Sequence, residues 1–189
     1  MAHLMKRVSV VYAASSIILA VGCAEAPDRN TPEGAVMQAS HGGTEIHPED
    51  DCDPVTFGAL CKAGFNGTTT LDSFRAQFAA TNQVVGWEYG GGQATVNLGS
   101  SLQVDNRGGE VHTFTVVANF GGGRVPPLNT GNPTVAPECV AGPNASNVDI
   151  ASGGGIAVTT GANGVIKAKG TYKVQCCIHP WMRTTVVVQ

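Results

Sequence analysis

The sequence predicts an all-β fold, a sandwich or a barrel of short strands. Glycine is abundant, with 25 residues among 189, and only 13% of the residues are charged. Long stretches with the 3.6-residue period of a helix are few, whereas short segments rich in β-branched and aromatic residues recur between glycine-rich turns. The length corresponds to one domain with additional segments, which is enough to bury a hydrophobic core.

Residues 1–23 have the pattern of an export signal. Lys6 and Arg7 precede a 14-residue apolar stretch, Val8 to Val21, which is too short to span a bilayer comfortably. Two cleavage sites compete: Leu19-Ala-Val-Gly-Cys23 resembles a bacterial lipobox, whereas Ala24-Glu-Ala26 fits an ordinary small-residue site. With the first, Cys23 would carry lipid and anchor the protein to a membrane. In both cases we expect an exported protein, in the periplasm or on the outer surface of the cell.

The charge of the mature chain excludes one class of partner. Removal of the leader leaves nine basic and fourteen acidic residues, so the net charge changes from −3 to −5. An acidic chain without a basic face argues against nucleic-acid binding.

Two segments are predicted before the β domain. Residues 24–50 are expected to be a flexible tether, because prolines and glycines interrupt any periodicity and polar residues fill the gaps. Residues 51–86 are expected to be a short helical, disulfide-bonded extension. In it, Asp53 is a helix cap followed by Pro54 at the first helical position, and a second short helix is predicted at Leu71 to Ala80. The helices either cover one end of the sandwich or dock a partner.

Residues 87–189 form the predicted β domain. Its strands are short and are separated by turn residues. Those expected before the C-terminal loop are Trp87–Tyr89, Ala94–Leu98, Ser101–Val104, Val111–Ala118, Gly155–Thr159 and Val165–Ala168. Asn163-Gly164 predicts a type I′ turn, which requires positive φ angles. Residues 121–147 are rich in glycine, proline and asparagine and are too long for a simple hairpin, so this segment is either stapled or a functional loop.

Three candidate metal ligands lie in a short loop near the C-terminus. Cys176, His179 and Met182 are spaced three residues apart, between an alternating strand and a valine-rich one. Thiolate and thioether sulfur favour Cu(I), and two histidines with a cysteine and a weak axial methionine describe a blue-copper electron-transfer centre. His112, in an upstream β-branched stretch, is the candidate for the missing ligand.

Strand alternation distinguishes the two adjacent cysteines. Cys176 shares a face with Val174, whose apolar side chain marks that face as inward, and Cys177 points the other way. The same alternation places His112 with Phe114, again on the inward face. Cys176 and His112 are therefore predicted to meet at the core.

Each of these residues also has an ordinary structural role. A single inward histidine is more often a core residue than a ligand, and a methionine near a strand end usually packs. Adjacent cysteines in an exported protein usually form disulfides. The residues together are nevertheless a specific constellation, and copper is favoured over tetrahedral zinc, which has no use for methionine.

With Cys176 assigned to the metal and Cys23 a candidate for lipidation, four cysteines remain for disulfides. They are Cys52, Cys61, Cys139 and Cys177. Four cysteines admit three pairings, and the sequence does not choose among them. We prefer Cys52–Cys61, which are close along the chain, together with Cys139–Cys177.

The run from Gly170 to Val188 contains Cys-Cys-Ile-His-Pro-Trp-Met-Arg and resembles the copper loop of the cupredoxins, most closely the amicyanin kind. Asn106-Arg-Gly-Gly-Glu-Val-His112 is similar to the segment before the first histidine ligand in that family. The resemblance covers about residues 87–189 and implies a Greek-key sandwich of about eight strands that holds one type 1 copper. The ligands that it implies are His112, Cys176, His179 and Met182, and Asn106 would tie the two ligand loops together.

The same resemblance implies a monomeric one-electron carrier between redox protein partners, and not an enzyme. It implies His179 as the electron port, and Pro180 and Trp181 would belong to an apolar docking patch around it. Copper delivery or storage is the alternative function. A copper enzyme would need a second metal cluster, but of the five histidines one lies in the leader and two in the tether. A metal-free adhesion sandwich would leave the ligand spacing unexplained.

Overall fold

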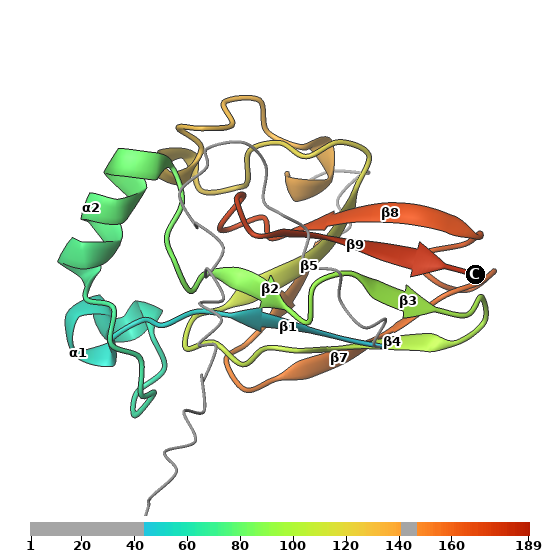
Figure 1. Ribbon diagram of the computed structural model, residues 1–189, viewed down its shortest axis with the longest axis horizontal. Helices are drawn as coiled ribbons and strands as arrows, with labels where there is room; N and C mark the ends of the chain where they lie inside the picture. Colours follow the sequence, from blue (N-terminus) through green and yellow to red (C-terminus); the bar gives the residue numbers. More distant parts are fainter. Residues whose placement is uncertain (1–43, 141–146) are drawn as a thin grey trace, which may run out of the picture. The chain divides into compact units, whose positions relative to one another are not determined.

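Residues 44–140 and 147–189 are described by the structure, a computed structural model (Figure 1). They form a four-stranded sheet in the order β2-β1-β4-β7 and a five-stranded sheet in the order β3-β9-β8-β5-β6. The strands are β1 (Glu45–Glu49), β2 (Glu88–Gly90), β3 (Ala94–Val96), β4 (Ser101–Asp105), β5 (His112–Val117), β6 (Val148–Ile150), β7 (Gly155–Thr159), β8 (Gly170–Gln175) and β9 (Arg183–Val188). The all-β sandwich predicted from the sequence is confirmed, with nine strands in the described residues.

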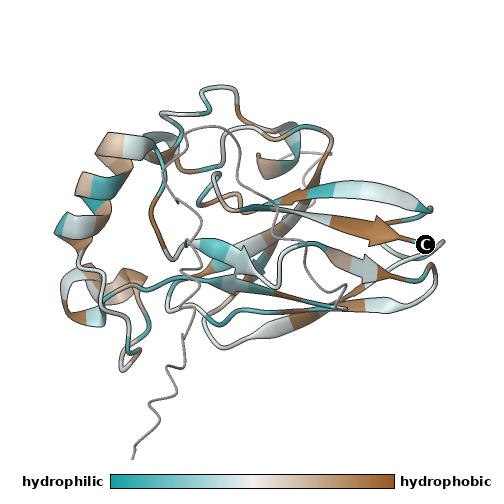
Figure 2. Cartoon of the chain, in the orientation of Figure 1, coloured by the Kyte–Doolittle hydropathy of each residue, from teal (hydrophilic) through white to brown (hydrophobic). Residues whose placement is uncertain are grey.

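The hydrophobic core lies between the two sheets. Ile46, Leu102 and Val104 of the four-stranded sheet and Val174 and Val186 of the five-stranded sheet are fully buried in one cluster. Buried and exposed residues alternate along β4, as expected for a strand with one face on the core and one on solvent. Figure 2 shows the hydrophobic end of β9, which belongs to the same core.

Strand β1 corrects the predicted tether and the start of the β domain. Residues 24–50 were expected to be tether, but Glu45–Glu49 pairs antiparallel with β2 and parallel with β4. The sequence did not predict this strand, because Pro48 and the acidic residues beside it are not typical of a strand. Its burial comes from pairing with strands far along the chain. The β domain therefore begins at β1 and not at residue 87, and 51–86 is an insertion between two strands. Residues 1–43, with Cys23 and both cleavage sites, lie outside the described residues.

The predicted helices form close to where they were expected. Helix α1 (Pro54–Phe57) is capped by Asp53, whose side chain accepts a hydrogen bond from the Val55 amide, and a 3₁₀ turn follows at Gly58–Leu60. Helix α2 (Leu71–Thr81) is capped by Thr70 and ends at Asn82, which is left-handed with φ 56°. Both helices lie at one end of the sandwich (Figure 1). In the described part of the chain, no helix combines the length and the apolarity that crossing a bilayer requires.

Residues 165–168 do not form the predicted strand. Ile166 makes an isolated parallel bridge with Thr160, and its side chain is fully buried in the core. Asn163 does not supply the positive φ of a type I′ turn, because Asn82 is the only non-glycine residue with positive φ among those described. Burial of one isoleucine, and not strand pairing, anchors this segment.

The long segment after β5 is stapled to the sandwich. It contains 3₁₀ turns at Pro126–Leu128 and Pro137–Cys139, and residues 141–146 lie outside the described part. Its apolar residues form a second small cluster with Val117 and Cys177. The disulfide Cys139–Cys177 joins the segment to the C-terminal loop, and Cys52–Cys61 closes the helical extension. These are the two pairs preferred on the sequence.

The lengths of the two disulfide loops predict unequal contributions to stability. Replacing Cys139 and Cys177 together by serine should lower the free energy of unfolding by about 3–4 kcal/mol, because that bond joins residues 38 apart in the sequence. The matched double substitution at Cys52 and Cys61, which are 9 apart, should cost about 2–3 kcal/mol. Urea unfolding of the metal-free protein without reductant measures both. A larger loss from the shorter loop would contradict this explanation.

Candidate metal centre

Three buried side chains converge where β5 begins and β8 ends. His112 is the first residue of β5, Cys176 directly follows β8, and His179 lies in the loop between β8 and β9. β5 and β8 are antiparallel neighbours, with Thr115 opposite Gln175, so these two strand ends meet. One ligand atom from each of the three residues lies within 4.8 Å of the others. The structure thus brings together the three ligands that were predicted to share the inward face and the loop.

Both imidazole rings present Nδ1 to the cysteine sulfur. The Nδ1–Sγ separation is 3.9 Å for His112 and 3.9 Å for His179. A metal ion with bonds of about 2.0 Å to nitrogen and about 2.3 Å to sulfur would span such a gap. Two nitrogens, one thiolate and a buried setting fit a copper ion, so the residues present match the group that the sequence resemblance implies.

Met182 is brought to the same place by the main chain. The Cys176 amide donates to the Met182 carbonyl oxygen (3.1 Å), and the Met182 amide donates to the His179 carbonyl oxygen (2.9 Å). Its side chain is buried, with 1% of the residue exposed. The loop therefore closes on itself and keeps the thioether residue beside Cys176.

The two adjacent cysteines have separate environments, as strand alternation predicted. Cys176 is a free cysteine in the main core, whereas Cys177 is disulfide-bonded in the second cluster. Thr113 of β5 contacts both, because its amide donates to Cys176 Sγ (3.4 Å) and its hydroxyl accepts from the Cys177 amide (2.7 Å). Cys177 points away from the metal cluster but is not exposed, because the long segment covers it.

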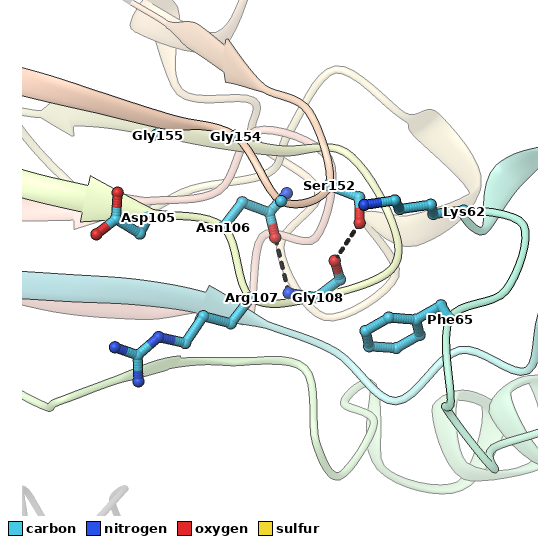
Figure 3. A pocket seen from close by; sticks show the side chains of 10 residues that line it. Lys62, Phe65, Asp105, Asn106, Arg107, Gly108, Ser152, Gly154 and Gly155 are labelled. Atoms are coloured by element: carbon cyan, nitrogen blue, oxygen red, sulfur yellow. Dashed lines mark hydrogen bonds between the residues drawn. The ribbon is translucent and has the colours of Figure 1, made fainter.

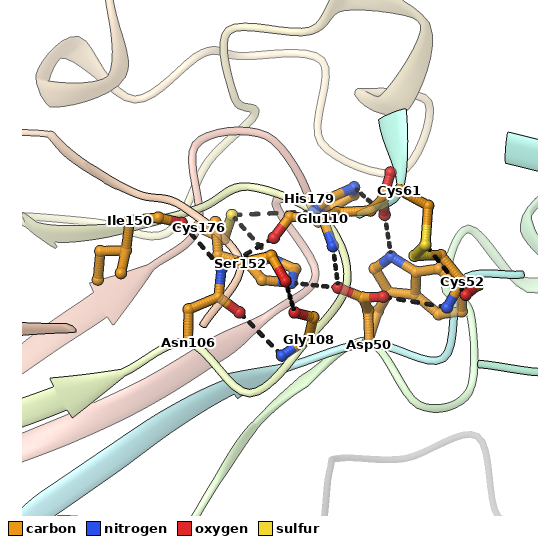
Figure 4. A network of polar contacts seen from close by, with 12 residues as sticks. Asp50, Cys52, Cys61, Asn106, Gly108, Glu110, Ile150, Ser152, Cys176 and His179 are labelled. Atoms are coloured by element: carbon orange, nitrogen blue, oxygen red, sulfur yellow. Dashed lines mark hydrogen bonds and ion pairs between the residues drawn. A yellow bond between two sulfur atoms is a disulfide. The ribbon is translucent and has the colours of Figure 1, made fainter. Parts of the chain in front are cut away.

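Buried carboxylates stand behind both imidazoles (Figure 4). Asp50 Oδ2 lies 2.9 Å from His112 Nε2, and Glu110 Oε2 lies 3.3 Å from His179 Nε2. Sequence reasoning missed both acids. Asp50 fell at the end of the predicted tether, where acidic residues suggest solvent. The one available signal was that Glu110 precedes His112 by two residues, as strand neighbours on one face do.

Charge pairing explains the ionisation of the centre. Burial disfavours the charged imidazole, but the contacts with Cys176 and Glu110 outweigh it and raise the pKa of His179 to about 9. Burial would also raise the pKa of Cys176, yet its contacts with His112 and His179 lower that pKa well below its ordinary value. Both shifts favour a thiolate facing imidazolium in the metal-free centre, and thiolate is the form of cysteine that binds metal.

An aromatic layer covers His179 and corrects the predicted docking patch. His179 is only 2% exposed and Pro180 is buried. The Trp181 ring lies 5.4 Å from the His179 ring and packs on Phe74 and Phe78 of α2, at 6.1 and 5.2 Å between centroids. The helical extension therefore occupies the position expected for a patch of His179, Pro180 and Trp181, because packing these aromatic faces removes apolar area from water.

Asn106 was expected to tie the two ligand loops together, but its side chain bonds within its own loop and to Ile150 of β6. Its side-chain amide donates to the carbonyl oxygens of Glu110 and Ile150, each at 2.8 Å, and its Oδ1 accepts from the Gly108 amide at 2.9 Å. No hydrogen bond of Asn106 reaches the loop of Cys176 in the described residues. Asn106 instead holds Glu110 in place from the side of β6 (Figure 4).

A pocket of about 470 Å³ lies beside the Asn106 loop (Figure 3). Lys62, Asp105, Arg107 and Ser152 are among the residues that line it. Ser152 donates to the Gly108 carbonyl oxygen (2.6 Å) and so braces one wall. None of the three clustered ligands lines this pocket, which is therefore separate from the candidate metal centre.

No protein-family model and no curated protein match the sequence. Solved structures of cupredoxins do match, the family whose copper loop the sequence resembles. A purple cupredoxin from Nitrosopumilus maritimus is 13% identical, with a TM-score of 0.39 and coverage of 77% of this chain and 98% of that one. A reduced Cu(I) amicyanin mutant is 24% identical, with a TM-score of 0.34 and coverage of 54% and 73%. These values are too low to transfer a function, so the proposals below rest on the residues of this chain.

The lowered pKa of Cys176 predicts a thiolate in the metal-free protein at neutral pH. The ultraviolet absorbance of thiolate should persist at pH values well below 9.0, the ordinary pKa of the thiol, because the two imidazoles stabilise the anion. The matched blank is Cys176→Ser, and the difference between the two spectra isolates this residue. A difference absorbance that appears only near the ordinary pKa of 9.0 would contradict the pairing.

Proposed function

We propose that the protein is a type 1 copper protein of the cupredoxin kind, which carries single electrons between redox protein partners outside the cytoplasm. The observation that supports this most directly is the buried cluster of one thiolate and two imidazole Nδ1 atoms. A site of this composition, with a methionine beside it, suits copper better than other common metals. Copper, when bound, supplies the one-electron Cu(II)/Cu(I) couple.

The residues of the chain hold the centre in one arrangement. His112, Cys176 and His179 would bind the metal, and Met182 would provide a weakly bound thioether sulfur. The Cys176 sulfur accepts a hydrogen bond from Thr113, and the main chain locks Met182 to the same loop. Ligands held this firmly change little between two oxidation states, and fast electron transfer requires such a centre.

The electron route in this proposal passes through Trp181. His179 is covered, so a partner would not contact its ring directly. Trp181 is partly exposed and its ring stands edge-on to that of His179, at 5.4 Å between centroids. The redox partner would therefore approach the surface near Trp181 and α2.

The location outside the cytoplasm is proposed from two features. The first 23 residues have the pattern of an export signal. Two disulfides in the folded chain are typical of an oxidising compartment. Lipidation at Cys23 would add membrane anchoring, and the mass of the mature N-terminal residue distinguishes the two cleavage sites.

Copper delivery is less favoured than electron transfer. A delivery protein passes the metal from its ligands to those of an acceptor, which requires access to the ligands. Here His112, Cys176 and His179 are each at most 2% exposed. The carrier should therefore retain its copper through repeated oxidation and reduction in the presence of an apo acceptor, and quantitative loss to that acceptor would favour delivery or storage.

The copper-loaded protein should be coloured by a strong visible thiolate-to-copper band, because Cys176 is the single free cysteine in the described residues. Cys176→Ser should abolish the band. The double variant Cys139→Ser/Cys177→Ser should keep it, since neither sulfur faces the cluster. Visible absorbance after copper addition measures all three proteins. A colourless wild type that purifies with zinc would overturn the proposed function.

A further inference from the structure

We propose that Asp50 and Glu110 are positioning residues of the metal centre, which orient the two histidine ligands and favour the oxidised state of the bound copper. This inference rests on the proposed function, because it assumes that the cluster binds copper. Four observations carry it: the geometry at each imidazole, the support of each carboxylate, the burial of the whole network and its charge.

The side chain of Asp50 is held by backbone amides independently of its contact with His112. Its Oδ1 accepts the amide of Cys52 (3.0 Å), and its Oδ2 accepts the amide of Glu110 (2.8 Å) as well as facing His112 Nε2 (2.9 Å). The side chains of Asp50 and His112 are both 0% exposed. Two backbone amides therefore hold the carboxylate of Asp50 in addition to its contact with His112. A buried and doubly anchored carboxylate leaves His112 a single orientation, with Nδ1 toward Cys176.

Glu110 performs the same function for His179. Its Oε2 accepts the indole N–H of Trp87 (2.6 Å) and lies 3.3 Å from His179 Nε2. Asn106 holds the Glu110 carbonyl oxygen (2.8 Å), so both the backbone and the side chain of this residue are fixed. The side chain of Glu110 is 10% exposed and that of His179 is 3% exposed. His179 is therefore also held with Nδ1 toward Cys176.

The chain packs tightly around the carboxylate of Asp50, which is 0% exposed. A Cβ at Gly108 would collide with Oδ2 of Asp50, and one at Gly109 would collide with the sulfur of Cys52. These two glycines allow the extension to close over the loop that precedes His112. The disulfide-bonded extension thus supports the metal centre, since its Cys52 amide holds Asp50 at the point where β1 passes into the extension.

The charge of this network determines which oxidation state it favours. The Cys176 sulfur and the carboxyl groups of Asp50 and Glu110 are three acidic side chains around one cation site, and as a thiolate and two carboxylates they would carry three negative charges. With neutral imidazoles, Cu(II) would leave a net charge of −1 and Cu(I) a net charge of −2. In a medium of low dielectric the more negative state is less stable, so both carboxylates should lower the reduction potential. A carboxylate behind a ligating imidazole also strengthens the ligand, and its loss typically weakens metal binding by about 10–100-fold.

The test compares Asp50→Asn and Glu110→Gln with Asp51→Asn as the matched control. Asp51 adjoins Asp50, and its carboxylate accepts hydrogen bonds from Thr68 and Thr69, not from an imidazole. Each variant removes one negative charge with little change in shape. Zn²⁺ affinity, measured by competition with a chelator, should fall by about 10–100-fold in the first two variants and stay within about twofold in the control.

The reduction potential of the copper-loaded proteins is the second readout. Glu110→Gln and Asp50→Asn should each shift the equilibrium with a redox mediator toward Cu(I) by tenfold or more, which is about 59 mV for a one-electron couple. Asp51→Asn should shift it by less. If the Zn²⁺ affinities and the reduction potentials of Asp50→Asn and Glu110→Gln all match those of Asp51→Asn, the positioning role is overturned. Should Asp50→Asn fail to fold, Glu110→Gln decides alone, because its amide oxygen can still accept from Trp87.

These outcomes separate the inference from the proposed function. A wild type that binds Zn²⁺ but shows no thiolate-to-copper band would end the proposed function, while the zinc affinities of the three variants would still decide the positioning role. A wild type with the band, whose variants all behave alike, would end only the inference. A wild type that binds neither metal would end both.

Discussion

The structure depends on the pairing of buried charges around Cys176. A buried thiolate is costly unless neighbouring charges and hydrogen bonds compensate it. The groups of this network come from separate parts of the chain. His112 from β5 and His179 from the loop before β9 face the thiolate, and Asp50, directly after β1, pairs with His112. Each part must be in place for the others to be stable. The candidate centre is therefore also a junction at which both sheets and the extension are joined.

The insertion between β1 and β2 gives this centre its closed character. Its disulfide Cys52–Cys61 packs against Gly109, in the loop before His112. Its helix α2 supplies Phe74 and Phe78, which pack on Trp181. A ligand loop that would otherwise stand at the surface is thereby covered. The cover lowers the local dielectric, which strengthens every charge pair beneath it. In the proposed function, the contact with a redox partner would then lie away from His179.

The end of β8 that leads to the centre is buried on both faces. One face of β8 packs Val174 into the main core, and Gln175 on the other face bonds to Gly121 of the long segment. Cys176 and Cys177 continue these two faces, one toward the cluster and one into a disulfide. Cys176 therefore stays a free thiol and Cys177 forms a disulfide because their side chains lie on opposite faces of the chain. The long segment contributes here by shielding the sulfur that does not serve the cluster.

The sequence by itself determined the sandwich class, the capped helices and the choice of Cys176 over Cys177. These follow from local signals: alternation, capping residues, and a ligand loop whose members are three residues apart. Only the tertiary structure decided that β1 belongs to the sandwich, that residues 165–168 form no strand, and that Asp50 and Glu110 stand behind the imidazoles. Those features depend on contacts between residues as far apart as 50 and 112, and an acid leaves no local mark of whether it faces water or a buried histidine.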